Sequence, residues 1–362
     1  MIVGRTSTLA ETLLATVERM PSAAGGPLVA ELEKELATAF GTAHAVAVSS
    51  GTAALHTALV AAGTGPGDEV LVPAVCVPMT LAAVIHCGAR PIPVDCDESG
   101  FELDYDDLSS KLTARTRAVL PVHLAGRCLD LRRLANFAGT HGLALIEDAC
   151  QAQGSIFGDR FAGTHGTGCF SLKDGKILWA GEGGYVLTND AELADTARRF
   201  RTHGQVRHSR AGTRFGHNYR MPELTAALAQ ANLRLFPQLL ARRRRQTALL
   251  AALLDGLPGV VFPFPAIAET WNGYAPIFRL ALSRPRELCL RLAHAGVPNS
   301  VGTFGLISAD QLPAMVSYGP APCPRARESV DRTLAVVIQE QDDDERIRQL
   351  ADTITREVRQ WA

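Results

Sequence analysis

The sequence contains three short segments whose side chains are of types that carry out chemistry. The first is Ser49-Ser50-Gly51-Thr52, which joins an apolar run to a stretch with helical spacing. Free N–H groups, the positive end of the helix dipole and hydroxyl donors meet at such a turn, so it is suited to hold a phosphate. Serine and threonine also precede many helices simply as N-caps, and for this segment alone that alternative stays open.

The second segment, residues 143–149, is an apolar run that ends in Glu147 and Asp148. Parallel α/β sheets bind ligands at the carboxyl ends of their strands, so we expect one of these carboxylates to be functional. A carboxylate beneath a pyridine nitrogen keeps that nitrogen protonated, as enzymes that use pyridoxal phosphate (PLP) require. An aspartate that only caps the next helix is the alternative.

The third segment, residues 169–176, contains Lys173 and Lys176 and precedes Gly181-Glu182-Gly183-Gly184. Most lysines are surface residues, but one that is partly desolvated beside a carbonyl cofactor forms a Schiff base with it. The spacing alone does not separate the two lysines.

Around these segments, short apolar runs alternate with helical patterns. The sequence predicts strands at 43–48, 69–73, 91–94, 118–121, 143–146 and 184–188, a short strand at Cys169-Phe170-Ser171, and helices at 31–40, 53–62, 79–87 and 131–141. A further helix is predicted to follow Asp190 as its cap and to extend to about residue 197. This alternation predicts a mostly parallel, buried sheet.

The pattern changes after Arg220 to a long Leu/Ala/Arg helix at 222–254, which we expect Pro237 to interrupt. A domain boundary on this helix divides the chain into a large domain, 1–235, and a small domain, 236–362. In the small domain we expect a strand at 277–281 and helices at 286–295 and 342–358. The four arginines from Arg242 to Arg245 are predicted to spread around the helix and make local ion pairs.

The composition excludes several classes of protein. The 362 residues are 47% hydrophobic and 20% charged, which is typical of a globular chain and not of a disordered one. The net charge of −1 argues against nucleic acid or an anionic membrane as a partner. No transmembrane span is predicted, because the longest uncharged stretch, 36–67, is broken by polar residues and glycines. The 8 cysteines show no CxxC spacing, so no metal is expected; without a secretory signal they indicate a cytoplasmic protein.

Taken together and in this order, the segments resemble the DegT/StrS family of sugar aminotransferases, which are PLP enzymes of the aspartate aminotransferase fold type. The likeness covers residues 31–59, 67–97, 121–154, 166–190, 216–221 and 323–347. A collinear set of motifs is far more specific than any single one. The resemblance implies an α/β protein of PLP fold type I, with a mostly parallel sheet flanked by helices in the large domain and a smaller C-terminal α+β domain.

The resemblance also assigns site residues. The family pattern puts the Schiff-base lysine at Lys176 and leaves Lys173 as a loop residue. It implies that Asp148 pairs with the pyridinium nitrogen and that Gln151 lies near the phenolic oxygen of the ring. The phosphate-binding positions that it implies are Ser50, Gly51, Thr52 and Ser171. Asn218 matches an asparagine that reaches the phosphate of the neighbouring subunit, which implies a homodimer with shared active sites.

One position departs from the family pattern. Val77 stands where the family usually has an aromatic ring stacked on the cofactor, although an aliphatic side chain still covers a ring face by dispersion. Trp179 is expected to pack, with a wall of the pocket as the alternative, and His123 is expected to have a supporting role. Arg201, His203, Arg207, His208 and Arg214 either meet an anionic or polyhydroxyl substrate or form a solvated loop.

The function that the resemblance implies is transfer of an amino group, with L-glutamate as donor and a nucleotide-linked keto-deoxysugar or keto-cyclitol as acceptor. Such enzymes act on routes to antibiotics or surface polysaccharides. Two alternatives stay open: a PLP-dependent dehydratase or aromatising enzyme on an amino-cyclitol, and a non-catalytic paralogue that acts as a partner subunit. The presence of Lys176 favours transamination, and the motifs leave the acceptor unspecified.

Overall fold

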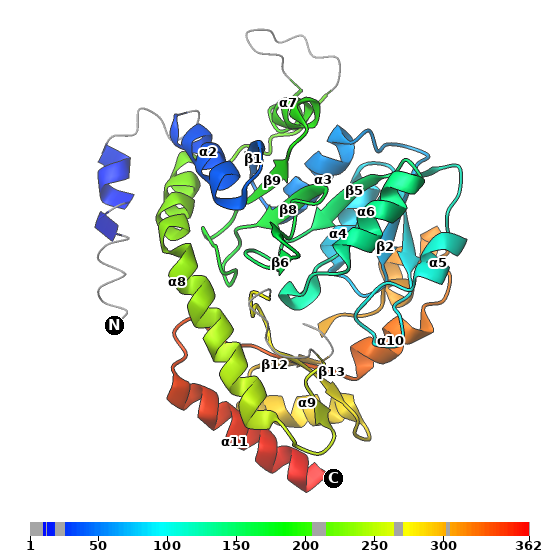
Figure 1. The fold of residues 1–362 in the computed structure, drawn as a ribbon, viewed down its shortest axis with the longest axis vertical. Helices are drawn as coiled ribbons and strands as arrows, with labels where there is room; N and C mark the ends of the chain where they lie inside the picture. The colour runs from blue at the N-terminus through cyan, green and yellow to red at the C-terminus, as the bar shows by residue number, and fades with distance from the viewer. Residues whose placement is uncertain are drawn as a thin grey trace.

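The structure is a computed structural model that describes residues 10–11, 13–18, 26–204, 215–263, 271–301 and 305–361. A large sheet with helices on both faces lies above a smaller sheet in the view of Figure 1. The helices are α2 (Leu28–Phe40), α3 (Gly51–Ala61), α4 (Pro78–His86), α5 (Tyr105–Ser110), α6 (Leu131–Thr140), α7 (Ala191–Phe200), α8 (Glu223–Leu254), α9 (Pro285–His294), α10 (Pro324–Asp331) and α11 (Asp344–Trp361). Short 3₁₀ helices span Leu124–Gly126, Ala309–Gln311 and Pro313–Tyr318. The strands are β1 (His44–Val48), β2 (Glu69–Pro73), β3 (Arg90–Val94), β4 (Thr116–Val119), β5 (Ala144–Asp148), β6 (Ile156–Phe157), β7 (Arg160–Phe161), β8 (Thr167–Ser171), β9 (Gly184–Thr188), β10 (Val260–Val261), β11 (Ile277–Leu280), β12 (Asn299–Val301) and β13 (Thr333–Val336).

The large sheet has the order β1-β9-β8-β5-β4-β2-β3. Strand β9 pairs antiparallel with both β1 and β8, whereas β8, β5, β4, β2 and β3 pair in parallel. Strand β1 therefore runs in the same direction as the parallel strands. The predicted mostly parallel sheet is confirmed, and the carboxyl ends of these strands meet at one edge.

Alternate residues of the strands build the two layers of the core. In β1, Val46 and Val48 join α3 and α4 in one apolar cluster, while Ala45 and Ala47 face α2 and the first half of α8 in another. Phe170 of β8 stacks on Tyr185 of β9 with ring centroids 4.6 Å apart. The period of two is that of strands buried on both faces.

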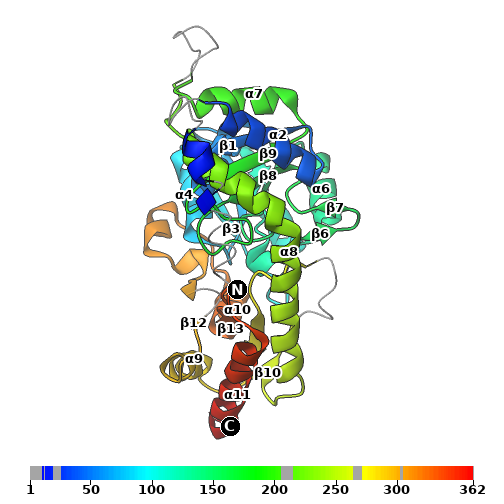
Figure 2. The same cartoon turned by 90° about the vertical axis from the view of Figure 1, so that its left-hand side faces the viewer.

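Helix α8 extends along both sheets, as Figure 2 shows. It packs against α2 at one end and against α11 at the other. The predicted interruption at Pro237 is wrong, because the helix runs from Glu223 to Leu254 with Pro237 inside it. Proline weakens a helix interior, but Phe236 and Leu239, on either side of Pro237, are buried in the core and hold the helix together.

The second sheet has the antiparallel order β10-β11-β13-β12 and is covered by α9, α11 and the end of α8. The division of the chain between 235 and 236 stays a prediction. Arg245 makes an ion pair, but with Asp344 of α11 at 2.9 Å and not with a local neighbour on α8 as expected. Arg243 and Arg244 instead donate to backbone carbonyls, because they face the buried side of α8.

Candidate active site

The first and third segments of interest meet where α3 begins and β8 ends. A Cβ atom at Gly51 would lie 2.8 Å from Cβ of Ser171 and 3.1 Å from Sγ of Cys150, so only glycine permits this approach. Ser50 is the N-cap of α3, and its hydroxyl accepts the N–H of Ala53 at 3.1 Å. The turn after β1 thus lies directly against the end of β8.

The donors at this point fit a phosphate. The N–H groups of Gly51 and Thr52 begin α3 and have no partner within the helix, and they lie at the positive end of its dipole. The hydroxyl oxygen of Ser171 accepts the N–H of Lys173 at 3.2 Å, which leaves the hydroxyl proton available. The turn therefore contains both the N-cap, in which Ser50 binds the N–H of Ala53, and separate donors that can bind a phosphate.

Asp148 ends β5 and is buried. Its Oδ2 accepts the hydroxyl of Thr80 at 2.7 Å, and its Oδ1 accepts the N–H of Cys150 at 3.2 Å. Burial and the Asp148 charge raise the pKa values of Cys76, Cys150 and Cys169, so these thiols stay neutral beside it. Asp148 is the anion of this part of the site, and it suits a protonated ring nitrogen.

Glu147 belongs to the opposite face of the sheet, because consecutive strand residues alternate. It accepts the N–H groups of Gly163, His165 and Gly166 at 2.7–2.8 Å. Burial alone would raise the pKa of Glu147, but hydrogen bonds from His123 and from these backbone groups hold it below its ordinary value. Of the two carboxylates, Glu147 braces the loop before β8 and Asp148 faces the site.

His123 supports this arrangement. Its Nε2 lies 3.0 Å from Oε2 of Glu147, and its Nδ1 accepts the N–H of Leu129 at 3.3 Å. The acceptor role of Nδ1 assigns the ring proton to Nε2, which donates to Glu147. The backbone N–H of His123 also donates to the carbonyl of Asp148 at 3.0 Å.

Gln151 has one half of its amide committed. Its Oε1 accepts the N–H of Ala125 at 2.7 Å, so its Nε2 is the half that remains to donate to a ligand oxygen. Ala125 has φ 57°, a left-handed conformation that is strained for a residue with a Cβ, and Gly126 follows with φ 85°. This turn presents the Ala125 N–H to Gln151.

Lys176 and Lys173 differ in their surroundings. Lys176 is half-buried and its Nζ lies 3.3 Å from the hydroxyl of Tyr274, whereas Lys173 is exposed. The loop that carries them is closed by three backbone hydrogen bonds, from Leu172 N to Gly183 O at 2.9 Å, from Asp174 N to Gly181 O at 2.9 Å and from Ala180 N to Leu172 O at 2.7 Å. The buried amide of Gln153 braces the same loop by donating to the carbonyls of Ser171 and Leu178.

The remaining predicted residues lie around this centre. Val77 is the half-buried N-cap of α4, and Trp179 is half-buried with its carbonyl bound by Asn232. Asn218 is exposed, and its neighbour Tyr219 accepts the N–H of Ser49 at 2.9 Å, which ties this segment to the phosphate turn.

The predicted substrate-facing cluster before Asn218 is only partly described. Arg201 pairs with Glu33 and donates to the carbonyl of Ala47, so it serves the core and not a substrate loop. The exposed side chain of His203 contacts Arg220 through Nε2 at 2.8 Å. Arg207, His208 and Arg214 lie outside the described residues.

Sequence reasoning missed Thr80, Gln153 and Tyr274. Thr80 lies on α4 and Tyr274 lies just before β11, far along the chain from the residues that they contact. No spacing in the sequence links them to Asp148 or Lys176. The one local signal for any of these residues is the pair of aromatic side chains in Trp271-Asn272-Gly273-Tyr274, which draws attention to the stretch that contains Tyr274.

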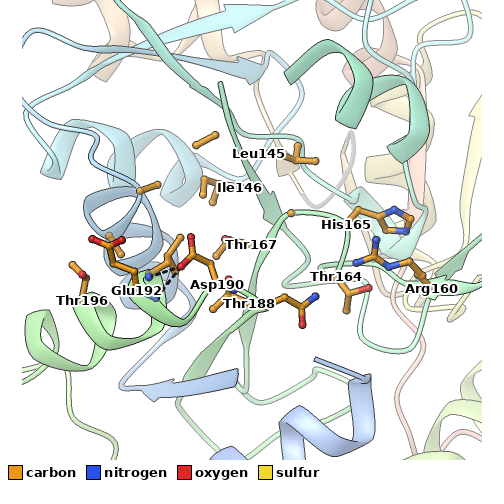
Figure 3. A pocket seen from close by; sticks show the side chains of 16 residues that line it. Leu145, Ile146, Arg160, Thr164, His165, Thr167, Thr188, Asp190, Glu192 and Thr196 are labelled. Carbon is orange, nitrogen blue, oxygen red and sulfur yellow. Dashed lines mark hydrogen bonds between the residues drawn. The ribbon is translucent and has the colours of Figure 1, made fainter. Parts of the chain in front are cut away.

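A cavity of about 550 Å³ lies at the other edge of the large sheet (Figure 3). It is lined by the starts of β5 and β8, and by Asp190, whose carboxylate caps α7 through the N–H groups of Glu192 and Leu193, as predicted. Asp148 and Ser171 are the last residues of β5 and β8, so they lie at the opposite edge of the sheet from this cavity. The cavity is therefore separate from the candidate active site.

Within the described ranges, no group of three or more His, Cys, Asp or Glu side chains is placed to hold a metal ion. None of the helices in the same ranges is both long enough and apolar enough to span a bilayer.

Two solved structures resemble this fold over nearly its whole length. DesV of S. venezuelae, solved in complex with a ketimine intermediate, is 31% identical with a TM-score of 0.90, covering 98% of this chain and 95% of that one. The 3-amino-5-hydroxybenzoic acid synthase is 29% identical with a TM-score of 0.88, covering 98% and 97%. These neighbours define the class of the protein, the α/β aminotransferase fold of PLP fold type I, as predicted.

The model of the DegT/DnrJ/EryC1/StrS aminotransferase family matches residues 7–355. The chain belongs to this family. GDP-perosamine synthase of Caulobacter vibrioides is 40% identical over 222 residues, which are 61% of this chain. The match spans 60% of the length of that relative.

Proposed function

We propose that this protein is a PLP-dependent aminotransferase that transfers an amino group from an amino acid to a keto-sugar. The observation that supports the proposal is the approach of Gly51 to Ser171 and Cys150, where the neighbouring strands β5 and β8 end in Asp148 and Ser171 and the loop with Lys176 follows β8. When bound, PLP supplies a carbonyl for condensation with an amine and a ring that accepts electrons.

Each residue then has a defined task. Backbone N–H groups of Gly51 and Thr52 and the hydroxyl of Ser171 would hold the phosphate. Asp148 would keep a proton on the ring nitrogen, and the Nε2 of Gln151 would donate to the phenolic oxygen. Lys176 would supply the amine that holds the cofactor carbonyl, and its free Nζ would act as the base for the proton of the donor α-carbon.

The acceptor is inferred from the relatives and the donor from the family pattern. The similarity to GDP-perosamine synthase supports a nucleotide-linked keto-sugar, and L-glutamate is the proposed donor. Routes to antibiotics or surface polysaccharides use such products. The similarity to 3-amino-5-hydroxybenzoic acid synthase keeps an aromatising reaction on an amino-cyclitol as the second candidate.

The proposed active form is a homodimer in which Asn218 reaches the phosphate site of the partner subunit. The exposure of Asn218 and the fully exposed Phe215, at 99%, support a contact surface in this segment. The proposed location is the cytoplasm, because all 8 cysteines are free and a reducing compartment keeps them so.

The test is an absorption spectrum of the purified protein with PLP, before and after L-glutamate. We expect a yellow band from PLP bound to Lys176, which glutamate bleaches and a keto-sugar acceptor restores. Lys176→Ala is expected to lack the band, and Lys173→Ala, changed three residues away, is expected to keep it. A stable band that glutamate leaves unchanged would support the aromatising reaction or another donor. Absence of bound PLP in the unaltered protein would contradict the proposal in favour of a non-catalytic paralogue.

A further inference from the structure

We infer that Tyr274 is a further active-site residue, which positions the amine of Lys176 whenever that amine is free. The inference rests on the proposed function, because it assigns to Tyr274 a task in the part of the cycle in which Lys176 is not bound to the cofactor. Tyr274 comes from the segment before the small sheet, whereas Lys176 lies in the loop between β8 and β9.

Two contacts of different kinds join the same amine to Tyr274. The Nζ of Lys176 donates to the Tyr274 hydroxyl at 3.3 Å, and it lies 4.8 Å from the centroid of the Tyr274 ring. The second distance is within the range at which an ammonium is attracted to an aromatic face. A flexible lysine side chain thus has one preferred position for its reactive atom.

Tyr274 can direct Lys176 because its own backbone is held. We call residues 271–274, Trp-Asn-Gly-Tyr, the clamp segment. Three of its carbonyls are bound by side chains of α8: Arg244 donates to Trp271 at 2.8 Å, Thr247 to Gly273 at 2.9 Å, and Arg243 to Tyr274 at 3.1 Å. Gly273 has φ 69°, and a Cβ there would meet the backbone of Arg243 and Arg244 at 3.0–3.2 Å.

The other side chains of the clamp segment reach the proposed cofactor residues. The Nε1 of Trp271 donates to the Ala125 carbonyl at 2.9 Å, and the Nδ2 of Asn272 donates to the Gln151 carbonyl at 2.8 Å. Ala125 is the residue whose N–H orients the Gln151 amide. One short segment therefore fixes Gln151 and Lys176 together, and α8 fixes the segment.

A nucleophile that is held in position reacts faster, because it has fewer conformations to lose before it reacts. Held by Tyr274, the free Nζ stays inside the site, whereas Lys173 is exposed to water. We therefore expect Tyr274 to slow reactions of Lys176 with reagents from solvent and to speed its reaction with bound cofactor. These two effects have opposite signs, and a general loosening of the fold is detected separately by thermal melting.

The first measurement uses the cofactor-free protein, so it does not depend on activity. The protein is acetylated with trace acetic anhydride, and labelling of Lys176 relative to Lys173 is read by peptide mass spectrometry. Tyr274→Phe keeps the ring and removes the hydroxyl. We expect it to raise the Lys176 to Lys173 ratio by about threefold, the effect of losing one hydrogen bond near the weak end of the usual range.

The matched control is Tyr105→Phe. Tyr105 also has a cation over its ring, Arg133 at 3.6 Å, and its hydroxyl is also hydrogen-bonded, here as donor to the Asp130 carbonyl at 3.4 Å, but it lies on α5 away from the loop of Lys176. We expect this variant to leave the ratio unchanged. Thermal melting of all three proteins identifies any general loss of fold.

The second measurement is the rate at which Lys176 captures PLP, trapped by borohydride reduction and quantified at the same peptide. We expect Tyr274→Phe to slow this capture by about threefold while acetylation of Lys176 becomes faster. An unchanged acetylation ratio, or a rise in both rates, would overturn the inference. Failure of the unaltered protein to capture PLP would count against the proposed function, and the acetylation ratio would still decide the contact with Tyr274.

Discussion

At the scale of single residues, two adjacent carboxylates have different tasks because a strand turns them to opposite faces. Glu147 accepts three backbone N–H groups and the ring of His123, and its burial leaves no room for a ligand. Asp148 accepts one hydroxyl and one backbone N–H at the edge of the sheet where the phosphate cradle lies. The same chemical group is structural in one position and proposed as functional in the next.

This contrast gives a paired prediction. Asp148→Asn is expected to reduce kcat/KM at least about 100-fold with little change in stability, because an amide cannot hold the ring nitrogen protonated. Glu147→Gln is expected to lower the free energy of unfolding by about 3 kcal/mol, because an amide NH₂ faces N–H donors that have lost their acceptor. Urea unfolding and steady-state kinetics on both variants check the pair. Equal loss of stability in the two variants would contradict the assignment.

A second residue-scale prediction concerns His56, which is buried with its Nδ1 3.0 Å from the hydroxyl of Tyr219. Burial, followed by the charges of His217 and His86, lowers the pKa of His56 to about 4. The unfolded chain binds a proton at this residue near pH 6.5, so between pH 6.5 and 4 protons favour the unfolded state. Stability from this group is therefore complete above pH 6.5 and is lost as the pH falls to about 4.

The measurement is the urea midpoint at pH 7 and pH 4.5. His56→Gln keeps a polar contact for Tyr219 and does not titrate. We therefore expect the decrease in the free energy of unfolding between pH 7 and pH 4.5 to be smaller in this variant by about 2 kcal/mol, a figure reduced for solvent screening. His141→Gln, an exposed residue after α6, is the control and is expected to keep the slope of the unaltered protein. The same slope in all three proteins would show that His56 does not titrate as proposed.

At the scale of elements, the turn at Ala125 and Gly126 joins the large sheet to the clamp segment. Its N–H orients Gln151, its carbonyls accept Trp271 and Ser155, and Asn272 packs against Gly126. Two successive left-handed residues allow these contacts from one short piece of chain. The strain at Ala125 is offset by the hydrogen bonds that it makes.

Gly126→Ala is expected to disrupt this turn. The new Cβ would lie 1.9 Å from Oδ1 of Asn272, at a φ of 85° that disfavours any side chain. We expect a loss of at least about 3 kcal/mol in the free energy of unfolding and weaker PLP binding, because Gln151 loses its orientation. Gly139→Ala is the control: it lies within α6 with no atom within 4 Å of its Cβ, and we expect it to stabilise the protein by about 0.5–1 kcal/mol. Urea unfolding and PLP titration of the two variants provide the comparison.

At the scale of the whole molecule, our proposal is that a second copy of the chain completes the active site. Asn218 is exposed, and its segment is anchored behind by the bond from Ser49 to Tyr219. The phosphate cradle of one subunit would then be built from two chains. This arrangement requires that neighbouring subunits share the same site.

Mixing of inactive variants tests the shared site. Lys176→Ala and Asn218→Asp are each expected to be inactive, the second because its carboxylate repels the phosphate. After unfolding and refolding together, half of the dimers pair the two variants, and each of these has one intact site. We therefore expect about a quarter of the unaltered activity to return. The same mixture assembled from separately refolded proteins is the control, and no recovery would argue for sites formed within one chain.

Local patterns along the chain are enough to predict the fold class and many of the elements. Strands 69–73 and 184–188 and the cap at Asp190 are where the sequence predicts them, because β-branched runs, turn residues and caps act over a few residues. The family follows from short motifs in a fixed order and is confirmed. The error at Pro237 arose because a local rule for proline was overruled by packing along α8.

Contacts between distant parts of the chain settle the rest. Burial in the folded protein distinguishes Lys176 from Lys173, and the sheet gives Glu147 and Asp148 different surroundings. Folding also brings Tyr274 within 3.3 Å of an amine 98 residues away in sequence. A sequence pattern reports the preferences of neighbours along the chain, whereas hydrogen bonds and desolvation act between neighbours in space. In this protein the local patterns therefore specify the sheet and the motifs, and the fold specifies which side chains of those motifs meet.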